Sequence, residues 1–222
     1  MNRILLLSTM LALGACGKTS SALERNRGGS GTGSLLVDAR IEQSSSSGAK
    51  TTFDVDLQDG GGLAVSGATV VVHNSPLGNV TLTEQAGTPG RYRNSVLALS
   101  GGDFGLDVSH PTKGSVTGVV VGNPGMHAIN APQAGVAVPK AQPLQISWTT
   151  PTTAYSASVE TKNFPPTLTP DTGTYTIPAA SNPAENAQRL DVSRYNIVNL
   201  AGGLIGSQMT LTSKLSVTYP VQ

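Results

Sequence analysis

The amino-acid sequence predicts an all-β protein made of two β-sandwich domains in tandem. Apolar and polar residues alternate with a period of two in two blocks, residues 34–130 and 143–222, as expected of strands that bury one face. Turn signals rich in Gly, Pro, Asn and Asp interrupt both blocks about every 8–15 residues. No stretch shows convincing 3.6-residue periodicity, so little helix is expected.

Residues 1–15 have the features of a secretory signal peptide. Arg3 is the only charge before Cys16, and an apolar run extends from Ile4 to Ala15. A positive start, a short apolar core and small residues before the cleavage point are typical of such a leader. The run is shorter than the roughly 20 apolar residues that a membrane-spanning helix needs. A secreted chain is therefore expected.

The end of this leader, Leu13-Gly14-Ala15-Cys16, resembles the lipobox of bacterial lipoproteins. The resemblance implies that a signal peptidase recognises Leu13, Gly14 and Ala15, and that Cys16 becomes a lipidated N-terminus with acyl chains such as palmitate. It also implies a lipid-anchored protein of the bacterial cell envelope. Gly17 at the next position, rather than Asp, implies the outer membrane if the source is Gram-negative. The alternative is an ordinary signal peptide before a chance cysteine.

Residues 16–33 are expected to be a flexible tether. They are rich in Gly, Ser, Arg and Asn and show no apolar periodicity. A flexible chain of this length reaches roughly 20–25 Å, which would hold the first domain just off the membrane. Lys18, Arg25 and Arg27 could approach anionic lipid, but Glu24 dilutes their charge.

The first block, residues 34–130, contains about seven short alternating strands. Its apolar positions include Leu35, Val37, Ala39, Ile41, Phe53, Val55, Leu57, Val70, Val72, Phe104, Leu106 and Val108. Charged residues such as Asp38, Arg40, Asp54 and Asp56 take the alternate positions. This pattern predicts the first sandwich, with one face of each sheet buried and the other exposed.

A hairpin in this block resembles those of carboxypeptidase regulatory-like (transthyretin-like) and bacterial Ig-like domains. The resemblance is carried by Val55-Asp56-Leu57-Gln58-Asp59-Gly60 and by Val65-Ser66-Gly67-Ala68-Thr69-Val70-Val71-Val72. Gly90-Arg91-Tyr92 matches a later feature of these domains, whereas Phe104 precedes Gly105 where the family has an aromatic residue after the glycine. The resemblance implies a sandwich over residues 34–130. It says little about function, because such modules serve as spacers and binding platforms in many proteins.

A linker is expected at residues 131–142, where Pro132 and Pro139 remove ladder donors. The second sandwich is expected over residues 143–222. Its first strand, Pro143 to Trp148, is similar to the B-strand region of fibronectin-type sandwiches, and Trp148 is expected in the core. Further apolar positions are Tyr155, Ala157, Val159, Tyr175, Ile177, Leu190, Val192, Leu215, Val217 and Tyr219.

Composition excludes several classes of partner and site. The chain has 14 Lys and Arg against 13 Asp and Glu and no basic stripe, so nucleic acid is not an expected partner. Cys16 is the only cysteine, so neither an intramolecular disulfide nor a thiolate metal site can form. The serines include no G-x-S-x-G nucleophile motif, and no cofactor is expected.

A few polar residues are candidates for chemistry. Asp56 and Asp59 are weak calcium candidates in a hairpin, although an alternating strand already explains an outward Asp56. His73 and His110 could meet across strands near an aspartate, but exposed histidines are the simpler interpretation. Arg194 is interpreted as a strand-end or edge arginine.

The sequence therefore favours a protein that is not an enzyme. We expect a lipid-anchored cell-envelope protein of structural or protein-interaction type. Its expected partners are the membrane, through Cys16, and another envelope protein. The alternative is a carrier of a small hydrophobic or carbohydrate ligand, bound between the sandwiches or at their tips. An enclosed apolar cavity of about 300–1,000 Å³ would favour the carrier.

Overall fold

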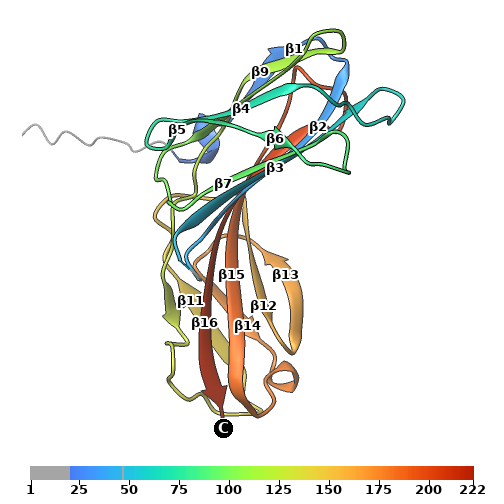
Figure 1. Cartoon of the computed structure of the whole chain (residues 1–222). Coiled ribbons are helices and arrows are strands. Elements are labelled where there is room, and N and C mark those ends of the chain that lie inside the picture. Colours follow the sequence, from blue (N-terminus) through green and yellow to red (C-terminus); the bar gives the residue numbers. More distant parts are fainter. Residues whose placement is uncertain (1–20, 47) are drawn as a thin grey trace, which may run out of the picture.

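The computed structural model describes residues 21–46 and 48–222. It is built almost wholly of strands, which confirms the predicted all-β class. The molecule has an upper and a lower part, and two long strands run through both (Figure 1). Cys16 and the leader, and with them the signal-peptide and lipobox predictions, lie outside the described residues.

Three sheets make up the two parts. The five-stranded sheet of the upper part has the order β1 (Arg27–Gly31), β9 (Gly114–Val121), β8 (Phe104–His110), β4 (Thr69–Asn74) and β5 (Gly78–Thr81). The three-stranded sheet of the lower part has the order β10 (Ile129–Ala131), β11 (Leu144–Trp148) and β14 (Thr174–Ile177). Two short 3-10 helices, η1 (Leu23–Arg25) and η2 (Ala179–Ser181), complete the fold.

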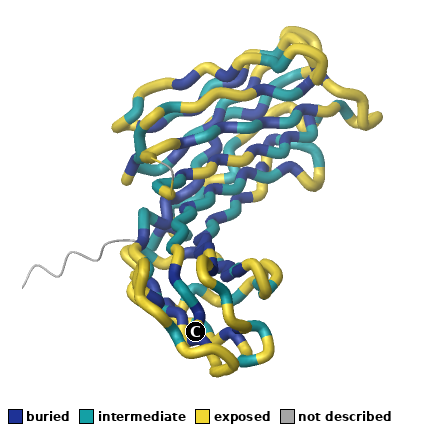
Figure 2. Tube along the Cα trace, turned by 60° about the horizontal axis from the view of Figure 1, so that its bottom comes forward, coloured by how far each residue is buried: buried dark blue, intermediate teal, exposed yellow. Residues whose placement is uncertain are grey.

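An eight-stranded sheet is shared by both parts. Its order is β13 (Phe164–Thr169), β12 (Ser156–Thr161), β15 (Glu185–Asn199), β16 (Gln208–Val221), β2 (Leu35–Ser44), β3 (Lys50–Asp59), β7 (Arg91–Val96) and β6 (Thr83–Glu84). Strands β16 and β2 pair in parallel, whereas the other pairs between named strands are antiparallel. The predicted alternation is visible along these strands as buried and exposed positions in turn (Figure 2).

The long β15–β16 hairpin contributes to two hydrophobic cores. Its upper residues Val198, Leu200, Met209 and Leu211 pack in the core of the upper part, with residues such as Phe53 and Phe104. Its lower residues pack in the second core; they are Leu190, Val192, Tyr219 and Val221. The range 143–222 therefore supplies strands to both cores. The division at residues 131–142 into independent folding units stays a prediction.

The expectation of a flexible tether is wrong for residues 21–33. Strand β1 pairs with β9 over Arg27↔Val120 to Gly31↔Val116. Its glycines permit this fit, since a Cβ on Gly31 would lie 2.2 Å from the carbonyl oxygen of Ser115. The same glycines led the sequence analysis to predict a flexible segment, because glycine is common both in flexible linkers and where backbones pack closely.

Candidate functional site

The outward face of the eight-stranded sheet carries many charged side chains. They alternate with core residues on successive strands, so they share one surface. The side chains of this face include Asp38, Arg40, Glu42, Asp54, Asp56, Arg91, Arg93, Glu160, Arg189, Asp191 and Lys214. The cross-strand pairs Asp54↔Arg93 and Asp56↔Arg91 place opposite charges side by side.

Four neighbouring hollows lie in a row along this face, and we call this row the sheet groove. A hollow of about 330 Å³ near Asp56 shares Arg40 with one of about 270 Å³. That hollow shares Glu42 with a third, of about 410 Å³, which also contains Lys214. The third shares Arg189 with a fourth, of about 310 Å³, at the far strands. The sheet groove is thus a row of open hollows, lined mostly by polar and charged residues, along the strands of both parts.

The charges of the sheet groove are paired with one another. Arg93 lies 3.1 Å from Asp54, and Arg40 lies 3.7 Å from Asp56. Asp191 lies 2.7 Å from Arg189 and 3.1 Å from the Nζ atom of Lys214. Burial raises the pKa of Asp191, but hydrogen bonds from Ser216, Arg189 and Lys214 outweigh it and hold that pKa below its ordinary value. The carboxylate therefore stays ionised at neutral pH.

An apolar tip adjoins one end of the sheet groove at the top of the upper part. Its hollow, of about 390 Å³, is lined by Leu36, Leu204, Ile205 and the glycine turn after β3. Ile205 is fully exposed and Leu63 is 69% exposed. Single exposed apolar side chains are common on protein surfaces, so the tip is of interest only because Leu36, Leu204 and Ile205 gather around one hollow.

The structure separates the two calcium candidates. Asp56 faces the sheet groove beside Arg40, whereas Asp59, three residues later, has the opposite parity on β3. Asp59 accepts hydrogen bonds from the backbone N–H groups of Gly61 and Leu63 and lies 3.0 Å from Lys113. The ion pair with Lys113, with these backbone hydrogen bonds, lowers the pKa of Asp59. Calcium binding stays a prediction that this geometry does not favour.

A buried ion pair lies at the waist between the two parts. The side chains of Arg194 and Asp171 are 0% and 1% exposed and 2.6 Å apart. Asp171 also accepts hydrogen bonds from Trp148 Nε1 (3.1 Å) and the Ala154 N–H (3.1 Å), and Arg194 donates to the Pro124 carbonyl (2.6 Å). The interpretation of Arg194 as an edge residue is therefore wrong. Every hydrogen bond of this pair is internal, which indicates a structural role.

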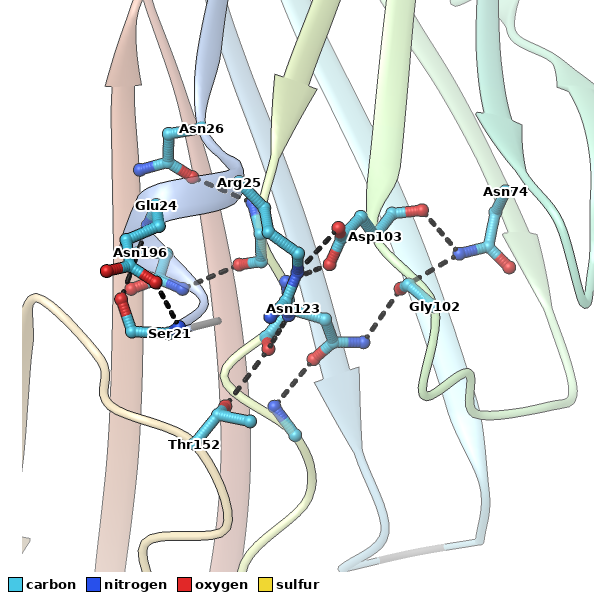
Figure 3. Close-up of polar contacts among 12 residues, drawn as sticks. Ser21, Glu24, Arg25, Asn26, Asn74, Gly102, Asp103, Asn123, Thr152 and Asn196 are labelled. Carbon is cyan, nitrogen blue, oxygen red and sulfur yellow. Dashed lines mark hydrogen bonds and ion pairs between the residues drawn. The ribbon is translucent and has the colours of Figure 1, made fainter. Parts of the chain in front are cut away.

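A second polar cluster fixes the chain where it passes between the parts (Figure 3). The Asn123 amide donates to the carbonyls of Ser100 (2.7 Å) and Gly102 (3.0 Å). The Asn123 carbonyl accepts from Arg25 (3.3 Å) and from the Thr152 hydroxyl (3.2 Å). Asn123 thus ties the first strands, the waist and the lower part together.

The three histidines lie apart from one another. His73 contacts Asp107 (Nε2 to Oδ2, 2.9 Å) and Asn79 on the outer face of the five-stranded sheet. His110 instead contacts the carbonyl of Ser66 (3.0 Å), so the two histidines do not meet. His127 is buried at the waist, and burial followed by the charge of Arg194 lowers its pKa to about 4.

Two absences among the described residues bear on the type of site. The part of the chain that the structure describes contains no group of three His, Cys, Asp or Glu side chains placed to hold a metal ion. Among the same residues, no helix is long and apolar enough to cross a membrane.

Comparison with known proteins finds remote likeness only. No family model and no curated protein sequence matches the chain. Fibronectin(III)-like modules of Clostridium thermocellum CbhA align over 84% of this chain and 94% of theirs (12% identity, TM-score 0.29). The Yersinia pseudotuberculosis adhesin InvE aligns over 84% of this chain but 60% of its own chain, with 13% identity and a TM-score of 0.29. A chimeric titin Z1Z2-Z1Z2 tandem aligns over 85% of this chain and 99% of its own chain, with 11% identity and a TM-score of 0.27. At such low TM-scores these likenesses carry no inference about function.

Proposed function

We propose that this chain is a lipid-anchored protein of the bacterial cell envelope that binds an extended segment of another envelope protein and catalyses no reaction. The sheet groove supports the binding role, because its hollows follow one another along the strands of both parts. The lipobox-like residues Leu13 to Cys16 support the anchor.

The chemistry of the sheet groove favours a polypeptide over a small molecule. Small-molecule sites are concave and mostly apolar, with few polar groups. The groove is instead lined by charges of both signs and by hydroxyl side chains such as Thr52, Ser216 and Thr218. When a peptide binds, these groups can replace the ion pairs and hydrogen bonds they make with one another by similar contacts with charged side chains and backbone groups of the peptide.

The ionisation of the groove residues supports binding rather than catalysis. A general acid or base works best with a pKa near the operating pH. The pKa of Asp191 is lowered and the pKa of Arg40 is raised; for Arg40 the main cause is the hydrogen bond that it donates to Asp38. Both shifts move the pKa values further from neutral pH. The two side chains therefore stay charged at neutral pH and are suited to electrostatic recognition.

Site-specific photo-crosslinking in cells tests the binding surface. A crosslinking side chain at Thr52, inside the sheet groove, should yield adducts with an envelope protein. The matched control is Thr69, exposed on strand β4 of the other sheet. Arg93→Glu, which changes a groove charge, should abolish the adducts, whereas Arg27→Glu outside the groove should not. Equal adducts from both positions, or adducts that survive Arg93→Glu, would refute the groove as the binding surface.

Membrane fractionation tests the anchor. Cys16→Ser should release the chain from membranes, because each buried CH₂ of an acyl chain contributes about 0.8 kcal/mol. If the Ser variant stays in the membrane fraction and keeps the same N-terminal mass, the anchor assignment fails.

The carrier remains a second candidate because of the apolar tip. Its hollow of about 390 Å³ falls in the size range of small-ligand sites. A hydrophobic dye such as anilinonaphthalene sulfonate should then bind the folded chain and be lost in Ile205→Ser. Dye binding that is unaffected by Ile205→Ser would exclude the tip as a carrier site.

A further inference from the structure

Ser21, the first residue that the structure describes, lies close in sequence to the proposed lipid at Cys16. The Ser21 N–H donates to the Glu24 carboxylate (2.7 Å), and the Glu24 N–H donates to the Ser21 hydroxyl (3.3 Å). Ala22 is fully buried, and its carbonyl lies 1.8 Å from where a Cβ on Gly122 would stand. The start of η1 is therefore fixed against the waist of the molecule (Figure 3).

The chain between the lipid and this fixed point is short. Ser21 is five residues after Cys16, and five residues span at most about 18 Å even when fully extended. The polar layer on each side of a bilayer is itself about 5–8 Å thick. Ser21 of an acylated chain can thus lie at most about 10–13 Å above the headgroups, which is less than the reach expected of residues 16–33.

The loop beside this point carries no charged residue. Thr152 and Arg25 donate to the same carbonyl, that of Asn123, so the loop before β12 lies next to η1. Within this loop the Tyr155 N–H donates to the side chain of Asn196 (2.9 Å), and the Tyr155 residue is 65% exposed. Residues 141–159 contain no Asp, Glu, Lys or Arg.

We propose that the acylated chain rests with this surface on the headgroups of the membrane that holds its lipid. The surface, which we call the waist face, comprises Leu23, Pro151, Thr152, Thr153 and Tyr155. This inference rests on the proposed lipid anchor. Tyrosine suits the membrane interface, because its ring is apolar and its hydroxyl can remain hydrated. The short connection gives the waist face a high effective concentration at the bilayer, so weak contacts suffice.

Fluorescence on the lipidated full-length chain in phosphatidylcholine vesicles tests the orientation. Cys16 is the only cysteine and its sulfur would carry the lipid, so a cysteine introduced by Tyr155→Cys can be labelled alone with an environment-sensitive dye. Lipids with a headgroup quencher should quench this dye several-fold more than a dye at Ile205→Cys or Leu168→Cys, both strongly exposed elsewhere. Because the five residues of the waist face carry no charge, the quenching should persist in 0.5 M salt, a condition in which charge attraction beyond about 4–5 Å is screened.

Each outcome separates the anchor from the orientation. Vesicle flotation and the mass of the N-terminal peptide report acylation; a chain without lipid refutes the proposed function. A lipidated, floating chain whose dye is quenched at residue 205 or 168 instead of 155, or at none, refutes the orientation alone. Inserting twenty Gly/Ser residues after Gly17 should lower the effective concentration of the waist face about tenfold, and reduce quenching at residue 155. Unchanged quenching in that variant would refute the role of the short connection.

Discussion

Acidification should destabilise the protein between about pH 6.5 and about pH 4, because His127 is buried as a neutral ring. His127 is 6% exposed; its Nδ1 lies 3.3 Å from the Ser213 hydroxyl, and its Nε2 has no hydrogen-bond partner among the described residues. Burial, and then the charge of Arg194, lower its pKa from 6.5 to about 4. A proton on this ring would be a second buried cation at the waist.

The size of the effect follows from the pKa difference between the unfolded and folded chains. The difference is about 2.5 units, and each unit corresponds to about 1.4 kcal/mol, so about 3 kcal/mol of stability is at stake. The unfolded chain has the higher pKa and takes up the proton first. The free energy of unfolding therefore falls as pH drops below 6.5, and this loss is complete below about pH 4. Asp171 and Asp191, with pKa values held below 3.8, add their losses only at lower pH.

Urea unfolding of residues 21–222, followed by Trp148 fluorescence, measures this loss. From about pH 7.5 to about pH 4.5 the wild-type chain should lose about 2.5 kcal/mol more than His127→Gln. Thr69→Ser, at an exposed residue of β4 that does not titrate, serves as the control and should keep the wild-type slope. Equal pH slopes for wild type and His127→Gln would show that His127 does not titrate as a buried group.

The waist and the close packing of β1 give further predictions. Arg194→Met should lower the free energy of unfolding by about 3–5 kcal/mol, because it leaves a buried carboxylate without its partner, whereas Arg40→Met on the surface should cost about 1 kcal/mol or less; urea unfolding measures both. Gly122→Ala should displace η1 and make the chain near it more sensitive to protease, and Gly101→Ala, where nothing lies within 4 Å, should not. A fragment of residues 143–222, followed by Trp148 fluorescence, should unfold at a lower urea concentration than the whole chain, because the apolar residues at the upper end of its long hairpin no longer pack in the upper core. An equal midpoint would contradict the claim that this packing stabilises the hairpin.

The sequence by itself determined the class of structure and the buried face of most strands. Leu35, Val37, Phe53 and Val55 lie in the core as their alternation predicted, because side chains along a strand point to opposite faces whatever the strand pairs with. The same parity predicted that Trp148 is buried. These are local properties, and a single segment carries enough information to specify them.

Only the tertiary structure decided which strands pair and which polar residues lie inside. The alternation of apolar and polar residues does not specify which strand a strand pairs with. The parallel pairing of β16 with β2, and the contribution of β15 to both cores, therefore could not be predicted from the sequence pattern. Arg194 occupies a core position that became tolerable only when folding brought Asp171 to it, 23 residues away in the chain. Strand β1 has the composition of a linker, and its glycines became packing positions only when β9 lay against them. The stability of these residues in the core depends on contacts with segments that are distant in the sequence, and the local sequence does not show which segments those are.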